Sequence, residues 1–145
     1  MQKTPPPHLD PQRPRIALRR ADQRALLAIA YRGLLRDTRS AGALLHEASR
    51  AELLDDDDEG ANTVALWSRV LFRDDRSGAH HWVTLVPPER AHPPTARLSA
   101  LSPVGAALIG LAKGQHIRCP DRRGGEVSLT VVAILPPPHE PGDPS

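Results

Sequence analysis

The apolar segment 102–114 restricts the fold of this chain more than any other stretch, because it carries its own helix start and stop signals. Ser102 can accept a hydrogen bond from the first turn, and Pro103 suits the first helical position, where its missing N–H would be unpaired anyway. Gly114 suits the left-handed position just past a helix end. The apolar residues between these ends recur at helical spacing: Val104, Ala107, Leu108 and Leu111. We therefore expect one short helix, buried on most sides and covered by the strands around it.

The composition predicts a modest core with unstructured ends. The 145 residues include 16 prolines but only two tryptophans, one tyrosine and one phenylalanine. Residues 1–14 are polar and rich in proline, which prevents a regular helix or strand, so we expect them to be disordered. The proline-rich tail 136–145 is expected to be loose for the same reason.

Charge and cysteine content indicate in which cellular compartment the protein works. The net charge is +2, from 19 Lys and Arg against 17 Asp and Glu, with a moderate excess of positive charge in the first 54 residues. The single cysteine, Cys119, excludes an intramolecular disulfide and fits a reducing compartment. The N-terminus lacks the apolar core of a signal peptide, and no apolar run reaches the length of a membrane span. The sequence therefore predicts a cytoplasmic protein without membrane contact.

Residues 15–54 are predicted to form a helical hairpin. An apolar face at helical spacing runs from about residue 15 to 36, and a second helix is expected over about 41–54, with Ser40 able to cap it. The residues expected at the tip of the hairpin are Arg36, Asp37 and Arg39. Two helices joined by a few polar residues form an antiparallel pair. Packing of this pair on the main domain and a protruding functional arm both remain open.

Residues 55–61 are expected to form an acidic linker, because like charges repel and stay solvated. A calcium-binding loop that started at Asp55 would need a glutamate at its twelfth position, where the chain has Leu66. His80 and His81 are adjacent in an expected strand and point to opposite faces, so one metal ion cannot easily take both. No arrangement typical of catalysis is present either. We therefore expect no metal, no cofactor and no enzymatic activity, and the sequence predicts a binding module.

From residue 62 onward the apolar period changes to two, which predicts strands. They are expected over 63–66, 69–73, 81–86, 97–101, 115–119 and 126–135. In the last of these, Val127, Leu129, Val131 and Ala133 share one face, and Ile134 lies on the other. Loops of hairpin length favour an antiparallel sheet and the α+β class. We therefore expect residues 62–135 to form one α+β domain, with an antiparallel sheet wrapped around the central helix.

Several motifs in this region agree, in order, with one known family. They are Thr84-Leu85-Val86 followed by Pro88, the run from Leu98 to Leu111 with Ser102-Pro103-Val104-Gly105 inside it, and Lys113-Gly114. Over about residues 62–143 the chain resembles the C-terminal domain of the bacterial Gre transcript-cleavage factors and, more closely, the regulator of nucleoside diphosphate kinase (Rnk) proteins. The resemblance implies an FKBP-like domain preceded by a short coiled-coil hairpin.

The resemblance also implies a partner, RNA polymerase, bound at the mouth of its secondary channel, and we expect the protein to be a monomer. In Gre factors the C-terminal domain grips the coiled coil of the largest polymerase subunit, partly through the loop that enters the Ser-Pro helix. This loop corresponds to Leu101, Ser102 and Pro103, although Gre factors commonly have an aspartate where this chain has Leu101. The resemblance implies no small-molecule substrate, and contact with nucleic acid only through the polymerase complex.

The tip of the hairpin decides between two functions that the resemblance allows. Gre factors carry two acidic tip residues that help to hold a second Mg²⁺ in the polymerase active centre. Here one carboxylate, Asp37, lies between Arg36 and Arg39, which is a poor site for a hard divalent cation. We therefore expect an Rnk-like regulator that competes with Gre factors without stimulating transcript cleavage. The alternative is an active Gre-like cleavage factor. A peptidyl-prolyl isomerase follows only from fold analogy, and four aromatic side chains can hardly line a proline pocket.

Overall fold

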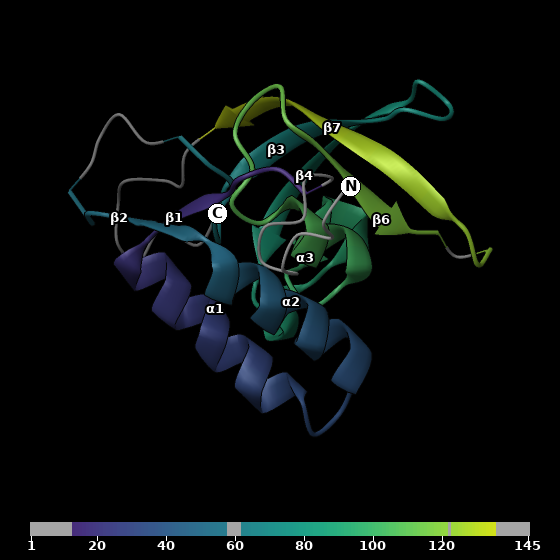
Figure 1. Cartoon of the computed structure of the whole chain (residues 1–145). Helices are drawn as coiled ribbons and strands as arrows, with labels where there is room; N and C mark the ends of the chain where they lie inside the picture. Colours follow the sequence, from purple (N-terminus) through teal and green to yellow (C-terminus); the bar gives the residue numbers. More distant parts are fainter. Residues whose placement is uncertain (1–12, 58–61, 122, 136–145) are drawn as a thin grey trace, which may run out of the picture.

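The computed structural model describes residues 13–57, 62–121 and 123–135 (Figure 1). In chain order the elements are β1 (Ala17–Arg19), α1 (Arg20–Gly33), α2 (Thr38–Arg50), β2 (Glu52–Leu54), β3 (Arg69–Asp74), β4 (His80–Val86), the 3-10 helices η2 (Pro88–Arg90) and η3 (Pro93–Thr95), β5 (Arg97–Ser99), α3 (Pro103–Leu108), β6 (His116–Pro120) and β7 (Glu126–Leu135). The expected disordered N-terminus up to residue 12, the acidic residues 58–61 and the tail 136–145 lie outside the described residues.

A five-stranded sheet in the order β5-β4-β3-β7-β6 forms the C-terminal part of the molecule. The strands predicted from the period-two pattern are confirmed at β3, β4 and β7, and together with the helices they give the expected α+β class. Three of the four strand pairs are antiparallel, but β4 and β5 are parallel, so the expectation of an antiparallel sheet is wrong at this edge. The reason is the connection: η2 and η3 carry the chain back, so that β5 runs in the same direction as β4.

A β-bulge changes the facing of the last residues of β7. The register with β3 shifts after Leu71, because Leu71 pairs with Ala133 while the next residue of β3 pairs with Val131. The extra residue, Val132, turns Ile134 toward the core, where it is 7% exposed. The predicted alternation is therefore correct through Val131 and wrong for Ala133 and Ile134.

The central helix α3 starts where the sequence predicts and ends earlier. The Ser102 hydroxyl accepts a hydrogen bond from the Gly105 N–H (3.0 Å), and Pro103 occupies the first helical position. Both features confirm the predicted start. The helix ends at Leu108, however, so the expectation that it continues to the residue before Gly114 is wrong.

The chain turns after α3 because it pairs with the segment 63–66. The Gly110 N–H donates to the Val64 carbonyl (2.8 Å), and the Val64 N–H donates to the Leu111 carbonyl (2.9 Å). Gly110 has a φ of +80°, a conformation that glycine adopts without a steric penalty. The strand expected over 63–66 does not form as a regular strand. Its pairing is limited to one isolated bridge, between Thr63 and Ala112.

The helices α1 and α2 lie side by side as a hairpin, but their bounds differ from the prediction (Figure 1). The expected helical start near residue 15 is wrong, because the residues before α1 are extended and β1 pairs in parallel with β2. β2 lies where the second helix was expected to continue to residue 54. Ile16 and Leu18 are buried, and the Ala17 N–H donates to the Gly110 carbonyl (3.0 Å). These contacts with distant residues override the local helical pattern.

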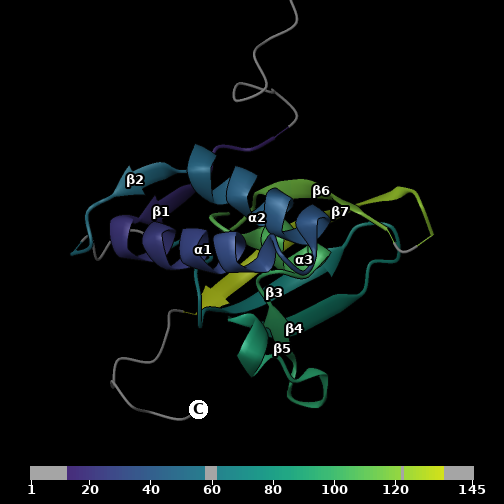
Figure 2. The same ribbon diagram turned by 90° about the horizontal axis from the view of Figure 1, so that it is seen from below.

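One core joins the hairpin to the sheet. Figures 1 and 2 show α1, α2 and α3 on the same side of the five-stranded sheet, with α3 between the hairpin and the strands. The fully buried leucines come from every part of this assembly: Leu18, Leu26, Leu44, Leu85, Leu108 and Leu111. The hairpin is therefore packed on the main domain, which was one of the two arrangements left open by the sequence.

The core also contains the single cysteine of the chain. Cys119 is buried on β6, and desolvation raises the pKa of its thiol to about 11, so that the thiol stays protonated at neutral pH. Among the described helices, none is long and apolar enough to cross a membrane.

Candidate functional site

The end of the hairpin is a tight turn fixed by backbone hydrogen bonds. The N–H groups of Arg36 and Asp37 both donate to the Gly33 carbonyl, at 3.0 and 2.9 Å. Asp37 then caps α2, because its carboxylate accepts from the Ser40 N–H (3.1 Å). The second helix thus begins at Thr38, and the expectation that Ser40 caps it is wrong. A carboxylate is favoured at this position because it accepts from an unpaired N–H at the positive end of the helix.

The loop before α3 is equally well fixed. The Ser102 hydroxyl donates to the Ser99 carbonyl (2.7 Å) while it accepts from the Gly105 N–H. The Leu101 N–H donates to the Ser99 hydroxyl (3.0 Å). Ser102 is therefore occupied by structural hydrogen bonds, and these bonds position the side chain of Leu101 beside them.

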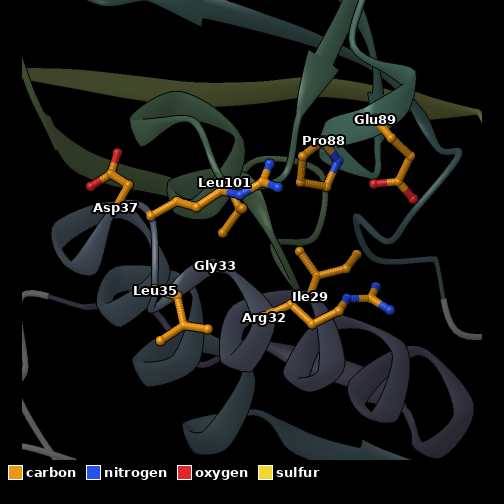
Figure 3. Close-up of a pocket in the computed structure, with 9 residues that line it drawn as sticks. Ile29, Arg32, Gly33, Leu35, Asp37, Pro88, Glu89 and Leu101 are labelled. Carbon is orange, nitrogen blue, oxygen red and sulfur yellow. The ribbon is translucent and has the colours of Figure 1, made fainter.

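These two segments face each other across a cavity of about 370 Å³, here called the hairpin-end cleft. It is lined by Ile29, Arg32, Gly33, Leu35, Arg36, Asp37, Pro88, Glu89 and Leu101. Figure 3 shows the hairpin residues on one wall and Pro88, Glu89 and Leu101 on the opposite wall. The walls touch at one point, where a β-carbon added to Gly33 would lie 3.0 Å from the Leu101 Cδ1 atom. The absence of a side chain at Gly33 allows this close approach.

The cleft has an apolar floor and a charged rim. Ile29 is buried beneath it, whereas Leu35 at the hairpin end is 94% exposed. Two arginines of the hairpin and two carboxylates contribute to the rim. The hydrogen bond from the Ser40 N–H lowers the pKa of Asp37, so this carboxylate is ionised at neutral pH. In the described parts of the chain, no three His, Cys, Asp or Glu side chains converge as a metal site would require.

The structure brings together only half of the site residues predicted from the sequence. Leu101, Arg36 and Asp37 line the cleft, although they belong to segments 64 residues apart. Ser102 and Pro103 adjoin Leu101 without lining the cleft, and Arg39 is an exposed residue of α2 that does not line it.

Sequence reasoning missed the other lining residues. Ile29 and Arg32 lie on the face of α1 that lines the cleft, and Pro88 and Glu89 are the first residues of η2, after β4. Their meeting depends on how the hairpin packs on the sheet, which no local pattern encodes. One signal was available: Leu35 is a large apolar residue next to a polar turn, a position where solvation alone would favour a polar side chain.

The shape and charge of this cleft suit the binding of a side chain. A shallow apolar floor within a rim of both charge signs can receive an apolar side chain from a partner protein and fix its orientation. Two backbone-fixed segments form the walls, so the cleft is already shaped before a partner arrives.

Comparison with known proteins gives a consistent result. The family model "Transcription elongation factor, GreA/GreB, C-term" matches residues 59–136. The chain is 36% identical over 131 residues to the transcription elongation factor GreA of Chloroflexus aggregans, covering 85% of this chain and 83% of that protein. It is 34% identical over 103 residues to the regulator of nucleoside diphosphate kinase of Escherichia coli strain K12, covering 71% and 76% of the two chains.

A solved structure agrees with these similarities. A prokaryotic transcription elongation factor GreA/GreB from Nitrosomonas europaea aligns with a TM-score of 0.66 and 29% sequence identity. The alignment covers 84% of this chain and 100% of that one, so the similarity includes the helical hairpin as well as the sheet.

Proposed function

Because this chain belongs to the family of transcription elongation factors with a GreA/GreB C-terminal domain, we propose that it binds RNA polymerase at the entrance of the secondary channel. The single observation that supports this proposal is the hairpin-end cleft, because Leu101, from the loop before α3, and the tip residues Arg36 and Asp37 all line it. Leu101 and the exposed Leu35 are apolar anchors, and the charged rim orients the partner. The partner segment is the coiled coil of the largest polymerase subunit, and the protein binds it as a monomer.

We further propose that the protein regulates transcription without stimulating transcript cleavage and competes with Gre factors for this entrance. Asp37 supports the proposal because one of its oxygens already accepts the Ser40 N–H that caps α2. Arginines at positions 36 and 39 oppose a divalent cation there. The hairpin is also short, since the 13 residues of α2 extend about 20 Å. An active Gre-like cleavage factor is the second candidate function, favoured by the 36% identity to GreA.

The first prediction concerns the exposed anchor of the cleft. Replacing Leu35 with aspartate should weaken binding to core RNA polymerase by roughly tenfold, the cost of losing an interface anchor and introducing a charge in its place. Leu35 is 94% exposed, so the free energy of unfolding should not change. Binding is measured by titrating labelled protein with core polymerase and following fluorescence anisotropy.

The matched control is Leu53→Asp, which places the same charge on an exposed leucine of β2, away from the cleft, and should leave the affinity unchanged. Leu101→Asp should also weaken binding, but it perturbs the contact with Gly33 and is therefore the less specific variant. An excess of a Gre factor should displace the protein from polymerase. The proposal is wrong if polymerase is not bound, or if binding is insensitive to Leu35→Asp and to the competitor.

The second prediction concerns cleavage. Added to backtracked elongation complexes, the protein should not raise the rate of transcript shortening above the intrinsic rate, and Asp37→Asn should leave that rate unchanged. The physical reason is that one carboxylate engaged in a helix cap supplies too little charge to hold a second Mg²⁺. A Gre factor in the same assay is the positive control. Cleavage by the wild-type protein that disappears in Asp37→Asn would establish the alternative function, an active cleavage factor.

A further inference from the structure

The face of the five-stranded sheet that points away from the helices has an unusual composition. All three helices α1, α2 and α3 lie on the other side (Figures 1 and 2). The strand pairing identifies the residues of this outer sheet face, because they alternate with buried ones. They are Arg69, Leu71, Arg73, His80, Trp82, Thr84, Arg97, His116, Arg118, Pro120, Glu126, Ser128, Thr130, Ala133 and Leu135.

Positive charge dominates the outer sheet face. Four arginines share it with two carboxylates, that of Glu126 at the start of β7 and that of Asp75, which is bound to hydroxyl groups of this face. Arg73 is paired with Asp75 (2.8 Å), whose carboxylate also accepts from the Ser128 and Thr130 hydroxyls at 2.9 and 2.7 Å. Arg69 and Arg118 form no ion pair with another described residue, so they supply positive charge that suits an anionic partner.

Aromatic rings lie among these cations. Trp82, in the middle of β4, is 43% exposed, and the Arg69 guanidinium lies 5.5 Å from its ring centroid. Arg97 is on the edge strand β5 and lies 6.0 Å from the ring centroid of Trp67. The register joins the two clusters, since Arg97 pairs with Thr84 and Thr84 pairs with Arg69. Each of the two tryptophans of the chain therefore lies near an arginine, and these two arginines belong to one row of paired residues across the sheet.

We infer that the outer sheet face binds single-stranded nucleic acid directly, with Trp82 as a stacking platform for a base and Arg69 and Arg118 as contacts for phosphates. An exposed aromatic ring between arginines on an open sheet is the arrangement that proteins use for unpaired bases. The bases of a duplex stay stacked on one another, so they cannot stack on the Trp82 ring. The four strand intervals from β5 to β6 span about 19 Å, enough for a short stretch of backbone.

This inference differs from the expectation that nucleic acid is contacted only through polymerase. It also stands apart from the hairpin-end cleft, which is lined by the hairpin, by η2 and by Leu101 and not by any residue of the outer sheet face. Failure of either proposal therefore leaves the other intact.

The test is fluorescence anisotropy of a fluorescein-labelled RNA strand of about 12 nucleotides, with single-stranded DNA and a matched duplex as parallel probes. We expect both single strands to bind and the duplex to bind at least roughly tenfold more weakly. Trp82→Ala should weaken binding roughly tenfold, whereas Trp82→Phe, which keeps a ring, should stay within about twofold of the wild type. Arg118→Ala should reduce the slope of log K against log salt by about 0.7.

The matched control is Arg24→Ala, which removes an exposed arginine of α1 on the opposite side of the molecule and should have no effect. Binding of RNA, DNA or both supports the inference and shows which of the two nucleic acids this face binds. Three results would overturn it: no single-strand binding at protein concentrations up to about 10⁻⁴ M, equal affinities of Trp82→Ala and Arg24→Ala, or a duplex bound as tightly as the single strands. Should Trp82→Ala fail to fold, the comparison of Arg118→Ala with Arg24→Ala decides.

Discussion

Replacing Gly105 with alanine should lower the free energy of unfolding by about 3 kcal/mol and the melting temperature by roughly 10 °C. A β-carbon at this position would lie 2.1 Å from the Ser99 carbonyl oxygen. That oxygen cannot move away freely, because it accepts hydrogen bonds from the Ser102 N–H (3.0 Å) and the Ser102 hydroxyl (2.7 Å). The added methyl group must therefore shift the backbone of β5 relative to α3. Chemical denaturation followed by tryptophan fluorescence measures the effect.

Gly42 provides the control for this substitution. It lies within α2, and among the described residues outside this helix no atom would lie within 4 Å of a β-carbon there. Gly42→Ala should therefore stabilise the protein by about 0.5–1 kcal/mol, the ordinary gain from removing a glycine inside a helix. A Gly105→Ala variant within about 0.5 kcal/mol of the wild type would show that the loop before α3 is softer than the structure indicates.

Replacing Glu47 with alanine should cost about 4 kcal/mol, because it leaves a buried positive charge without its counterion. Glu47 is 4% exposed, and its carboxylate accepts from Arg50 Nε and from Arg13 Nη1, the latter at 3.0 Å. The Arg50 side chain is 9% exposed and donates to the Pro14 carbonyl (2.8 Å). Its Nη2 atom has no hydrogen-bond partner among the described residues, so the guanidinium is already only partly satisfied.

Two further variants separate the loss of the charge pair from a general effect of mutation. Glu52→Ala removes an exposed glutamate of β2 and should change the free energy of unfolding by at most about 0.5 kcal/mol. The double variant Glu47→Leu with Arg50→Leu removes both charges and should recover most of the stability lost by Glu47→Ala. If the double variant is as unstable as Glu47→Ala, lost packing rather than an unpaired charge causes the effect.

Local patterns were sufficient to predict the parts of the fold that local chemistry determines. The alternation along β7 predicted its bounds, Glu126–Leu135, because a buried face requires apolar residues at every second position. Ser102 and Pro103 predicted the start of α3, because capping is a contact within one turn. The end of α3 depends instead on Val64, 46 residues away from Gly110, and could not be found from the helix alone.

The same division applies to the candidate site. Leu101 and the tip residues Arg36 and Asp37 were identified from the sequence by family resemblance, each on its own segment. That they line one cleft could not be predicted, because it follows from the contact between Gly33 and Leu101 across the packed hairpin. Pro88 and Glu89 join the cleft for a related reason, since η2 lies in the connection between the parallel strands β4 and β5, which local patterns did not indicate.

The parallel pair of β1 and β2 has a consequence for the entropy of binding. It ties together the two chain ends of the hairpin, and the Ala17 N–H bond to the Gly110 carbonyl attaches that base to the sheet domain. At the other end, Gly33 rests against Leu101. A helix pair held at both ends has little freedom left to lose when a partner docks against it. In the proposed complex with polymerase, the conformational cost of association is thus met during folding, and the hairpin acts as a preorganised wall of the proposed binding surface rather than as a mobile arm.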